Sequence, residues 1–126
     1  MIIIDCQTLD HVKMADPDLV LFSGSKDPET GISWCPDCTA IEPVMQKLYD
    51  NPDYSKTRIA ICSIERSVWK DQANEFRTGS LRLKSVPTLL VWRADKKRLA
   101  ESQCLDQGMI DMIMEEIPER SCSSCK

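Results

Sequence analysis

The sequence predicts a single α/β domain in which helices flank a central β-sheet. Apolar runs of strand length at positions 2–4, 18–24, 58–64 and 89–92 alternate with stretches of helical periodicity. Strands that alternate with helices are typical of this fold class. A length of 126 residues matches one domain, and 42% hydrophobic with 29% charged residues suits a water-soluble globule.

The first part of the chain is predicted to form a strand, a helix and a second strand. Three isoleucines at 2–4 begin a short strand, residues 8–15 are compatible with a brief helix, and the apolar strand 18–24 stops at Gly24. Residues 25–33 contain Pro28 and Gly31, which are typical of a loop. This loop leads to Trp34 and to a helix.

The next helix is predicted to begin at Pro36. Proline fits the first helical turn, where its missing N–H would have no partner. Pro43 lies inside the same helical pattern and should kink it. The apolar residues that recur at three- and four-residue spacing are Ala40, Ile41, Val44, Met45 and Leu48.

A strand and a helix are predicted after position 57. Residues 58–64 have the composition of a buried strand, and residues 68–78 that of a helix with Gly79 past its end. Trp69, Ala73 and Phe76 are expected to face the core.

A hairpin and a last helix complete the predicted domain. Strands at 89–92 and 98–100 flank a polar turn at 94–97, and Pro118 ends the last helix. The apolar stripe of that helix comprises Met109, Ile110, Ile113, Met114 and Ile117, and we expect Met109, Met112 and Met114 to pack in the core. The domain should span residues 1–118, followed by a polar tail at 119–126.

The charge balance argues against nucleic-acid and membrane partners. Twenty acidic residues against 16 basic ones leave a net charge of −4, so no cationic field attracts nucleic acid or anionic lipid. No apolar run approaches the ~20 residues that cross a bilayer, and residues 1–5 lack the features of a signal peptide. We expect a cytoplasmic protein without membrane association.

Seven cysteines form the most unusual part of the composition, and an odd number cannot pair fully within one chain. Cys62 and Cys104 are expected to be buried thiols, while the role of Cys6 stays open. The single histidine, His11, lies far from the cysteine pairs, so we expect a surface or packing role rather than a Cys–His hydrolase.

The sequence Cys35-Pro36-Asp37-Cys38 at a helix start has a specific chemical use. Thiolates attack disulfides, and the free N–H groups at a helix start stabilise a negative sulfur, so we expect Cys35 to be the acidic nucleophile. Two intervening residues bring Cys38 within bonding distance, which makes it the candidate resolving thiol. The negative charge of the Asp37 carboxylate disfavours a thiolate nearby and so limits the acidity of Cys35. This predicts a reductant rather than a strong oxidant.

Zinc binding is the main alternative for this motif, because half of a zinc site has the same spacing. Cys122 and Cys125 in the tail would complete such a site. The helical context favours redox chemistry, so we expect no metal. A mobile terminus and an internal electron relay are the two interpretations of the tail cysteines.

The chain resembles the thioredoxin fold and, within it, the thioredoxin-related proteins of about 14 kDa, the thioredoxin domain-containing protein 17 family. The resemblance runs from about residue 2 to 117, and the Trp-Cys-Pro-Asp-Cys motif after an extended loop is its most specific feature. The matching segments are Phe22-Ser23-Gly24-Ser25-Lys26-Asp27, Ser33-Trp34-Cys35-Pro36-Asp37-Cys38, Glu42-Pro43-Val44, Trp69-Lys70-Asp71, Asn74-Glu75-Phe76-Arg77, Val86-Pro87-Thr88-Leu89-Leu90 and Glu101-Ser102-Gln103-Cys104-Leu105.

This resemblance implies a thioredoxin-like fold with a central mixed sheet, in which a cis Pro87 faces the cysteine pair. It implies that Cys35 and Cys38 are catalytic and form the redox-active disulfide, that Trp34, Pro36 and Asp37 modulate the site, and that Val86 and Pro87 line the substrate groove.

The family's activity is disulfide reduction, together with a peroxidase-type activity. The resemblance implies a monomer that acts on small disulfides such as cystine and on selected protein disulfides. It implies recycling by thioredoxin reductase, so that NADPH is used indirectly and no cofactor is bound. The rival hypothesis is an interaction module that the cysteine pair switches between dithiol and disulfide, without physiological turnover.

One departure from thioredoxins concerns proton transfer. Thioredoxins carry a buried aspartate in the strand before the active site, whereas residues 19–22 here contain no acid. Proton transfer to or from Cys38 must then use water or another group, with Asp37 and Glu42 as the candidates.

Overall fold

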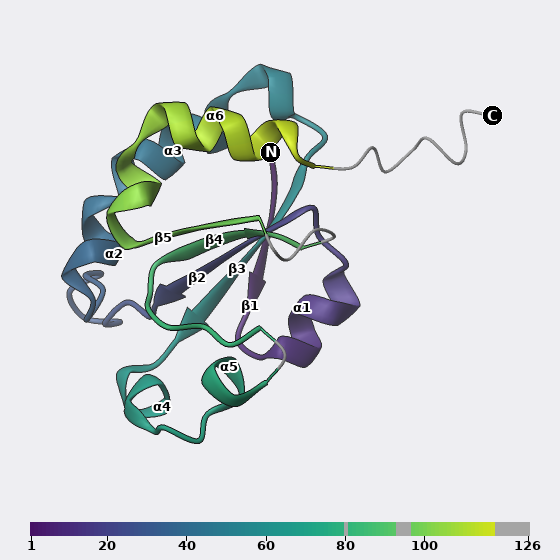
Figure 1. Cartoon of the computed structure of the whole chain (residues 1–126). Helices are drawn as coiled ribbons and strands as arrows, with labels where there is room; N and C mark the ends of the chain where they lie inside the picture. Colours follow the sequence, from purple (N-terminus) through teal and green to yellow (C-terminus); the bar gives the residue numbers. More distant parts are fainter. Residues whose placement is uncertain (80, 93–96, 118–126) are drawn as a thin grey trace.

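A five-stranded mixed sheet forms the centre of the computed structural model, which describes residues 1–79, 81–92 and 97–117 (Figure 1). Its strand order is β1-β3-β2-β4-β5; β1 and β2 run parallel to β3, whereas β4 is antiparallel to β2 and β5. The strands are β1 (Ile2–Cys6), β2 (Leu19–Gly24), β3 (Arg58–Ile64), β4 (Thr88–Val91) and β5 (Arg98–Ala100). The predicted α/β class, the mixed sheet and the β4–β5 hairpin are confirmed.

Helices cover both faces of the sheet (Figure 1). One face packs against α1, α4 and α5, and the other against α3 and α6. The helices are α1 (Leu9–Ala15), α2 (Pro36–Ala40), α3 (Glu42–Asp50), α4 (Arg66–Lys70), α5 (Glu75–Thr78) and α6 (Gln107–Glu115), with 3₁₀ turns η1 (Pro52–Tyr54) and η2 (Glu101–Leu105). No helix among the described residues is long and apolar enough to cross a bilayer.

The packing of strand β2 explains why its sequence is almost continuously apolar. Successive side chains of a strand point to opposite faces. Leu19 and Leu21 join the core beneath α3 and α6, while Val20 and Phe22 join the core beneath α1, α4 and α5. A strand buried on both faces therefore needs no polar alternation.

The kink predicted at Pro43 appears as a break between two helices. Helix α2 ends at Ala40, and α3 begins at Glu42 with Pro43 in its first turn. Proline has no N–H to donate to the carbonyl four residues earlier, so the helical ladder is interrupted at this point.

The single helix predicted at 68–78 is wrong, because α4 and α5 are separate and Ala73 is exposed. Buried Asn74 explains the break, since its side chain satisfies backbone groups on both sides. Its amide donates to the carbonyl oxygens of Val68, Trp69 and Asp71, and its Oδ1 accepts from the N–H groups of Phe76 and Arg77. Trp69 and Phe76 are buried as predicted.

The core positions predicted for the last helix need a correction. Ile110, Ile113 and Met114 are buried, but Met109 and Met112 are 37% and 67% exposed. At about 100° per residue, positions 109 and 112 fall more than a quarter turn from the centre of the stripe formed by the three buried residues. Pro118, the tail 119–126 and most of the turn predicted at 94–97 lie outside the described residues.

Candidate active site

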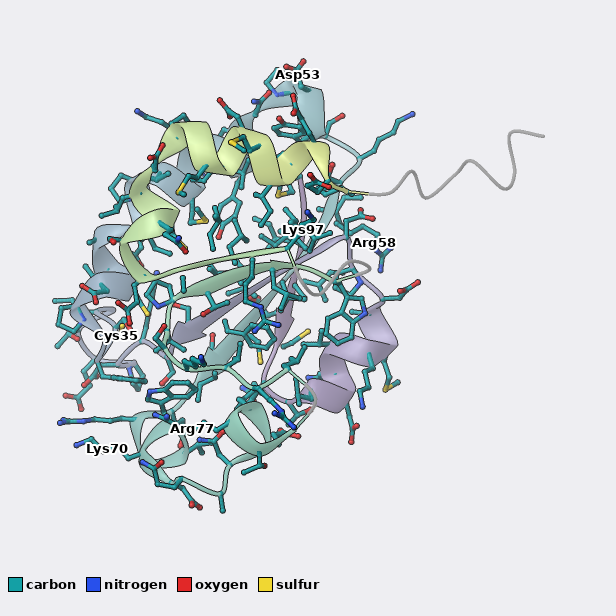
Figure 2. The ribbon with its side chains drawn as sticks, in the orientation of Figure 1. Cys35, Asp53, Arg58, Lys70, Arg77 and Lys97 are labelled. Atoms are coloured by element: carbon teal, nitrogen blue, oxygen red, sulfur yellow. The ribbon has the colours of Figure 1, made fainter. Side chains whose placement is uncertain are left out.

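The cysteine pair lies where β2, the following loop and α2 meet. Cys35 is the N-cap residue of α2, with an extended backbone, and its Sγ accepts a hydrogen bond from the Cys38 N–H (3.2 Å). Pro36 occupies the first turn, as predicted. Figure 2 shows Cys35 near the outer edge of the molecule. The backbone thus directs a donor at the first sulfur and holds Cys38 one turn away.

Val86 and Pro87 lie against this pair. The Val86–Pro87 peptide bond is cis, as predicted, and the Cys35 thiol donates to the Val86 carbonyl oxygen at 3.6 Å. The Pro87 carbonyl oxygen accepts from the Glu101 N–H at 2.8 Å, which ties this segment to η2. Folding therefore brings together two segments that are 51 residues apart in sequence.

The two thiols have different surroundings, although Cys35 is only 6% exposed and Cys38 3%. The Cys38 Sγ accepts a hydrogen bond from the Gly24 N–H at 3.3 Å. Burial, and secondly a hydrogen bond with Cys35, raise the pKa of Cys38 to about 12, while hydrogen bonds from Gly24 and Ser23 act in the opposite direction. Cys38 is therefore a protonated thiol at neutral pH.

Gly24 and Ser33, which the sequence did not single out as site residues, shape the entrance to the helix. The Ser33 hydroxyl donates to the Gly24 carbonyl (2.9 Å) and accepts from the Cys35 N–H (3.1 Å). The neighbouring Trp34 is fixed by its indole N–H, which donates to the Ile64 carbonyl (2.8 Å). A serine two residues before a helix-starting cysteine is the sequence signal for this contact.

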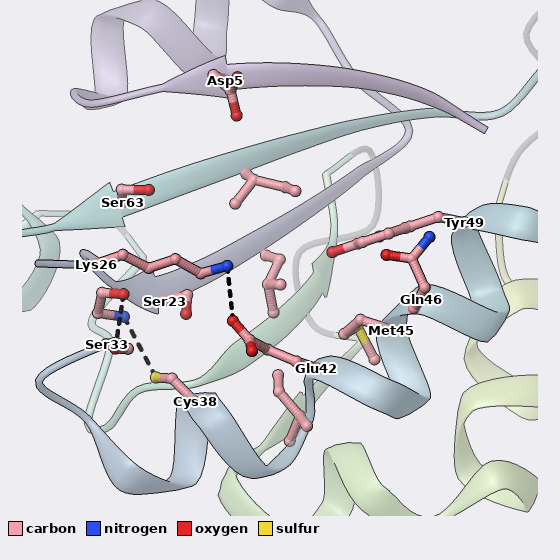
Figure 3. A pocket seen from close by; sticks show the side chains of 14 residues that line it. Asp5, Ser23, Lys26, Ser33, Cys38, Glu42, Met45, Gln46, Tyr49 and Ser63 are labelled. Atoms are coloured by element: carbon pink, nitrogen blue, oxygen red, sulfur yellow. Dashed lines mark hydrogen bonds and ion pairs between the residues drawn. The ribbon is translucent and has the colours of Figure 1, made fainter. Parts of the chain in front are cut away.

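A cavity of about 410 Å³ lies beside Cys38, between the sheet and α3 (Figure 3). Glu42 lines it and forms an ion pair with Lys26 (2.8 Å). Asp37 is exposed in the first turn of α2 and does not line this cavity. Of the two carboxyl groups proposed from the sequence, only that of Glu42 shares a cavity with Cys38.

The remaining described cysteines are buried thiols. Cys62 and Cys104 are fully buried, as predicted, and burial raises their pKa values to about 12 and about 11. Cys6, whose role was open, is also buried and is the register partner of Cys62 across β1 and β3. His11 is exposed on α1, in agreement with a surface role.

The zinc alternative depends on cysteines that the structure does not describe. Cys122 and Cys125 lie outside residues 1–79, 81–92 and 97–117. Within those ranges, no group of three or more histidine, cysteine, aspartate or glutamate residues is placed to hold a metal ion.

The mixed sheet and the Cys-x-x-Cys helix start facing a cis-proline define a thioredoxin-like protein of the oxidoreductase class. The family described as "Thioredoxin domain-containing protein 17-like, thioredoxin domain" matches residues 4–116, and the chain belongs to this family.

Individual relatives agree with this assignment. The chain is 40% identical over 95 residues to thioredoxin domain-containing protein 17 of Mus musculus and 39% identical over 95 residues to that of Homo sapiens, with 75% of each chain covered. It is 35% identical over 97 residues to the thioredoxin-like protein Clot of Arabidopsis thaliana, covering 75% of this chain and 72% of the relative.

Proposed function

We propose that this chain is a cytosolic disulfide reductase in which Cys35 is the nucleophile and Cys38 the resolving thiol. The observation that carries the proposal is the position of Cys35, which caps α2, accepts the Cys38 N–H and lies against Val86. Family membership supports the reaction class.

The reaction consists of two thiol–disulfide exchanges. The Cys35 thiolate attacks one substrate sulfur; a bond forms between Cys35 and that sulfur, the substrate S–S bond breaks, and the departing thiolate takes up a proton. Cys38 then loses its proton and attacks the Cys35 sulfur. The mixed disulfide breaks, the second substrate thiol leaves, and the Cys35–Cys38 disulfide retains the oxidation.

The proposed substrates are small disulfides such as cystine and selected protein disulfides, with a peroxidase-type activity besides. Residues 25–33 support the preference for small substrates, because this loop leads directly to Trp34 and Cys35 and would limit how closely a large folded partner approaches. Extended substrate segments would pair with the backbone at Val86 and Pro87.

Recycling completes the proposed cycle. Thioredoxin reductase would return the Cys35–Cys38 disulfide to the dithiol with electrons from NADPH, so a monomer needs no bound cofactor of its own.

The two cysteines are distinguished by single substitutions, which form our first prediction. Cys35→Ser should abolish turnover, whereas Cys38→Ser should keep the first attack and accumulate a mixed disulfide. The measurement is NADPH consumption with thioredoxin reductase and cystine, together with intact-protein mass spectrometry of the trapped species.

Two outcomes would contradict the assignment. Preferential alkylation of Cys38 in the native reduced protein would reverse the two roles. A wild-type protein that forms the disulfide but sustains no NADPH consumption would favour the redox-switched interaction module.

A further inference from the structure

The second exchange poses a proton-transfer problem that the cysteine pair does not solve alone. Cys38 attacks as a thiolate, yet burial and its contact with Cys35 raise its pKa to about 12. Strand β2 contains no aspartate or glutamate that could accept the proton of the Cys38 thiol. A proton acceptor near Cys38 would therefore accelerate release of the substrate.

The cavity beside Cys38 offers a limited set of acceptors. The charged or titratable groups that face Cys38 or this cavity are Asp5, Lys26, Cys35, Glu42 and Tyr49. The ionisable groups of η2, which packs against α2, are Glu101 and Cys104, and neither lines the cavity.

Three of these groups are poor acceptors. An ammonium group such as that of Lys26 has no free lone pair. Burial, together with the charges of Glu42 and Asp5, raises the pKa of Tyr49 to about 12, so its hydroxyl stays protonated. Asp5 lies on β1, which β3 separates from β2, and two strand spacings amount to about 10 Å.

Glu42 is placed differently. It follows Cys38 by four residues, and Ile41 between the two helices keeps a right-handed helical backbone, with its N–H still donating to the Asp37 carbonyl (3.3 Å). One helical turn therefore connects the two residues, and both face the cavity (Figure 3).

Lys26 holds the carboxylate at the mouth of this cavity. Its Nζ lies 2.8 Å from the Glu42 Oε1, and both side chains are about half exposed (59% and 45%). Ion pairs in such settings add little to stability. The cavity is polar and, at about 410 Å³, large enough to hold water that links Glu42 to the Cys38 thiol.

We propose that Glu42 accepts the Cys38 proton across this cavity during the second exchange and that Lys26 is a positioning residue for its carboxylate. This inference rests on the proposed reductase function. The proton leaves the Cys38 sulfur for the Glu42 carboxylate, and the S–S bond between Cys35 and Cys38 forms as the bond between Cys35 and the substrate sulfur breaks. The departing substrate thiolate takes up a proton from solvent, and Glu42 returns its proton to solvent. No further reactant is needed.

The decisive experiment compares the two exchanges in rapid-mixing kinetics. Glu42→Gln should leave the first exchange, measured with cystine in a Cys38→Ser background, unchanged. It should slow decay of the mixed disulfide at neutral pH by at least about tenfold, which is less than the roughly 10²–10⁴-fold typical of a directly placed general base because the carboxylate acts through water. Glu42→Asp should restore part of this loss.

Asp5→Asn is the matched control, since it removes one carboxylate from the far side of the same cavity. Its mixed-disulfide decay should equal that of the wild type.

Chemical rescue gives an independent readout. In Glu42→Ala, added acetate should accelerate mixed-disulfide decay but leave the first exchange unchanged. Lys26→Met should give a decay rate between those of the wild type and Glu42→Gln.

The proposed function and the role of Glu42 are tested by different outcomes. If Cys38→Ser forms no mixed disulfide with cystine, the proposed function itself is wrong. If the first exchange proceeds but Glu42→Gln and Asp5→Asn resolve the mixed disulfide at equal rates, only the role of Glu42 is overturned. Equal slowing of both exchanges by Glu42→Gln would also overturn it, because it would indicate a structural effect.

Discussion

At the scale of single residues, Gly24 is the position where the site tolerates no side chain. A Cβ atom built there would lie 2.8 Å from the Trp34 Cε2 and 2.9 Å from both the Cys35 Cβ and the Ser33 Oγ. The same residue donates its N–H to Cys38 and its carbonyl accepts from Ser33. Close backbone approach, rather than an unusual φ, is therefore the reason for glycine.

Gly24→Ala should disturb the site and destabilise the fold. Relief of three contacts below 3.0 Å requires shifts of Trp34 and Cys35, and overpacking of this kind costs about 1–3 kcal/mol. Urea denaturation and cystine turnover measure the two effects. Gly108→Ala in the exposed first turn of α6, where the nearest atom is the Asp106 Oδ1 at 3.2 Å, serves as the control and should keep full turnover.

Among the elements, the loop between β2 and α2 forms a hairpin-like structure that leads directly to Cys35. Lys26 and Ser33 form a bridge, and the Asp27 N–H donates to the Ile32 carbonyl (2.9 Å). Gly31 adopts a φ of 72°, a conformation that favours glycine. Ile32, which follows Gly31, is 60% exposed. We expect a loop in this position to restrict the approach of bulky substrates.

Shortening this loop should broaden substrate choice. Replacement of residues 28–31 by Asn-Gly joins Asp27 to Ile32 through a two-residue turn and keeps the Lys26–Ser33 bridge. We expect kcat/KM for insulin to rise by at least about twofold relative to that for cystine. A glycine–serine tip of unchanged length is the control. An unchanged ratio in the shortened protein would assign selectivity to Asp37 or to another feature of the site.

At the scale of the whole molecule, buried thiols link stability to pH. Cys38, Cys62 and Cys104 lie in the two core layers, and burial raises their pKa values to about 12, 12 and 11. A thiol whose pKa is higher in the folded state than in the unfolded chain stabilises the fold below the unfolded pKa. That contribution is lost as the pH rises toward the folded pKa.

The free energy of unfolding of the reduced protein should therefore fall between about pH 9 and pH 12. At about pH 10 each of the three thiols should account for about 1.5–2 kcal/mol of the loss. Urea denaturation at neutral and alkaline pH measures this change. The double variant Cys62→Ala, Cys104→Ala should show a clearly smaller loss, and an equal loss would refute the role of the buried thiols.

Local sequence patterns predicted much of the fold because they report on local backbone preferences and on one-sided burial. The apolar strand 19–24, the helix start at Pro36 and the break near Pro43 each follow from neighbouring residues. The cysteine pair was predicted as the candidate site for the same reason, since thiol–disulfide exchange needs two cysteines at a fixed spacing at a helix start. The prediction of a cis peptide bond before Pro87 came from the family resemblance and not from a local backbone preference.

Several expectations failed where specific side-chain contacts override a periodic pattern. The periodicity of residues 68–78 is helical, yet the buried amide of Asn74 donates to backbone carbonyls before it and accepts from backbone N–H groups after it, which divides the helix. Met109 and Met112 are apolar, but only the packing of α6 against β5 and η2 decides which side of the helix is covered.

The α/β class, the nucleophile candidate and the family could be predicted from the amino-acid sequence, because these depend on residue types at fixed short spacings. The folded structure was needed to show that Glu42, not Asp37, lines the cavity beside Cys38, and that Gly24 approaches Trp34 and Cys35 too closely for a side chain. The physical reason is that both facts are distances between separate elements. Such distances arise when β2, the following loop and α3 pack together, and no local pattern encodes them.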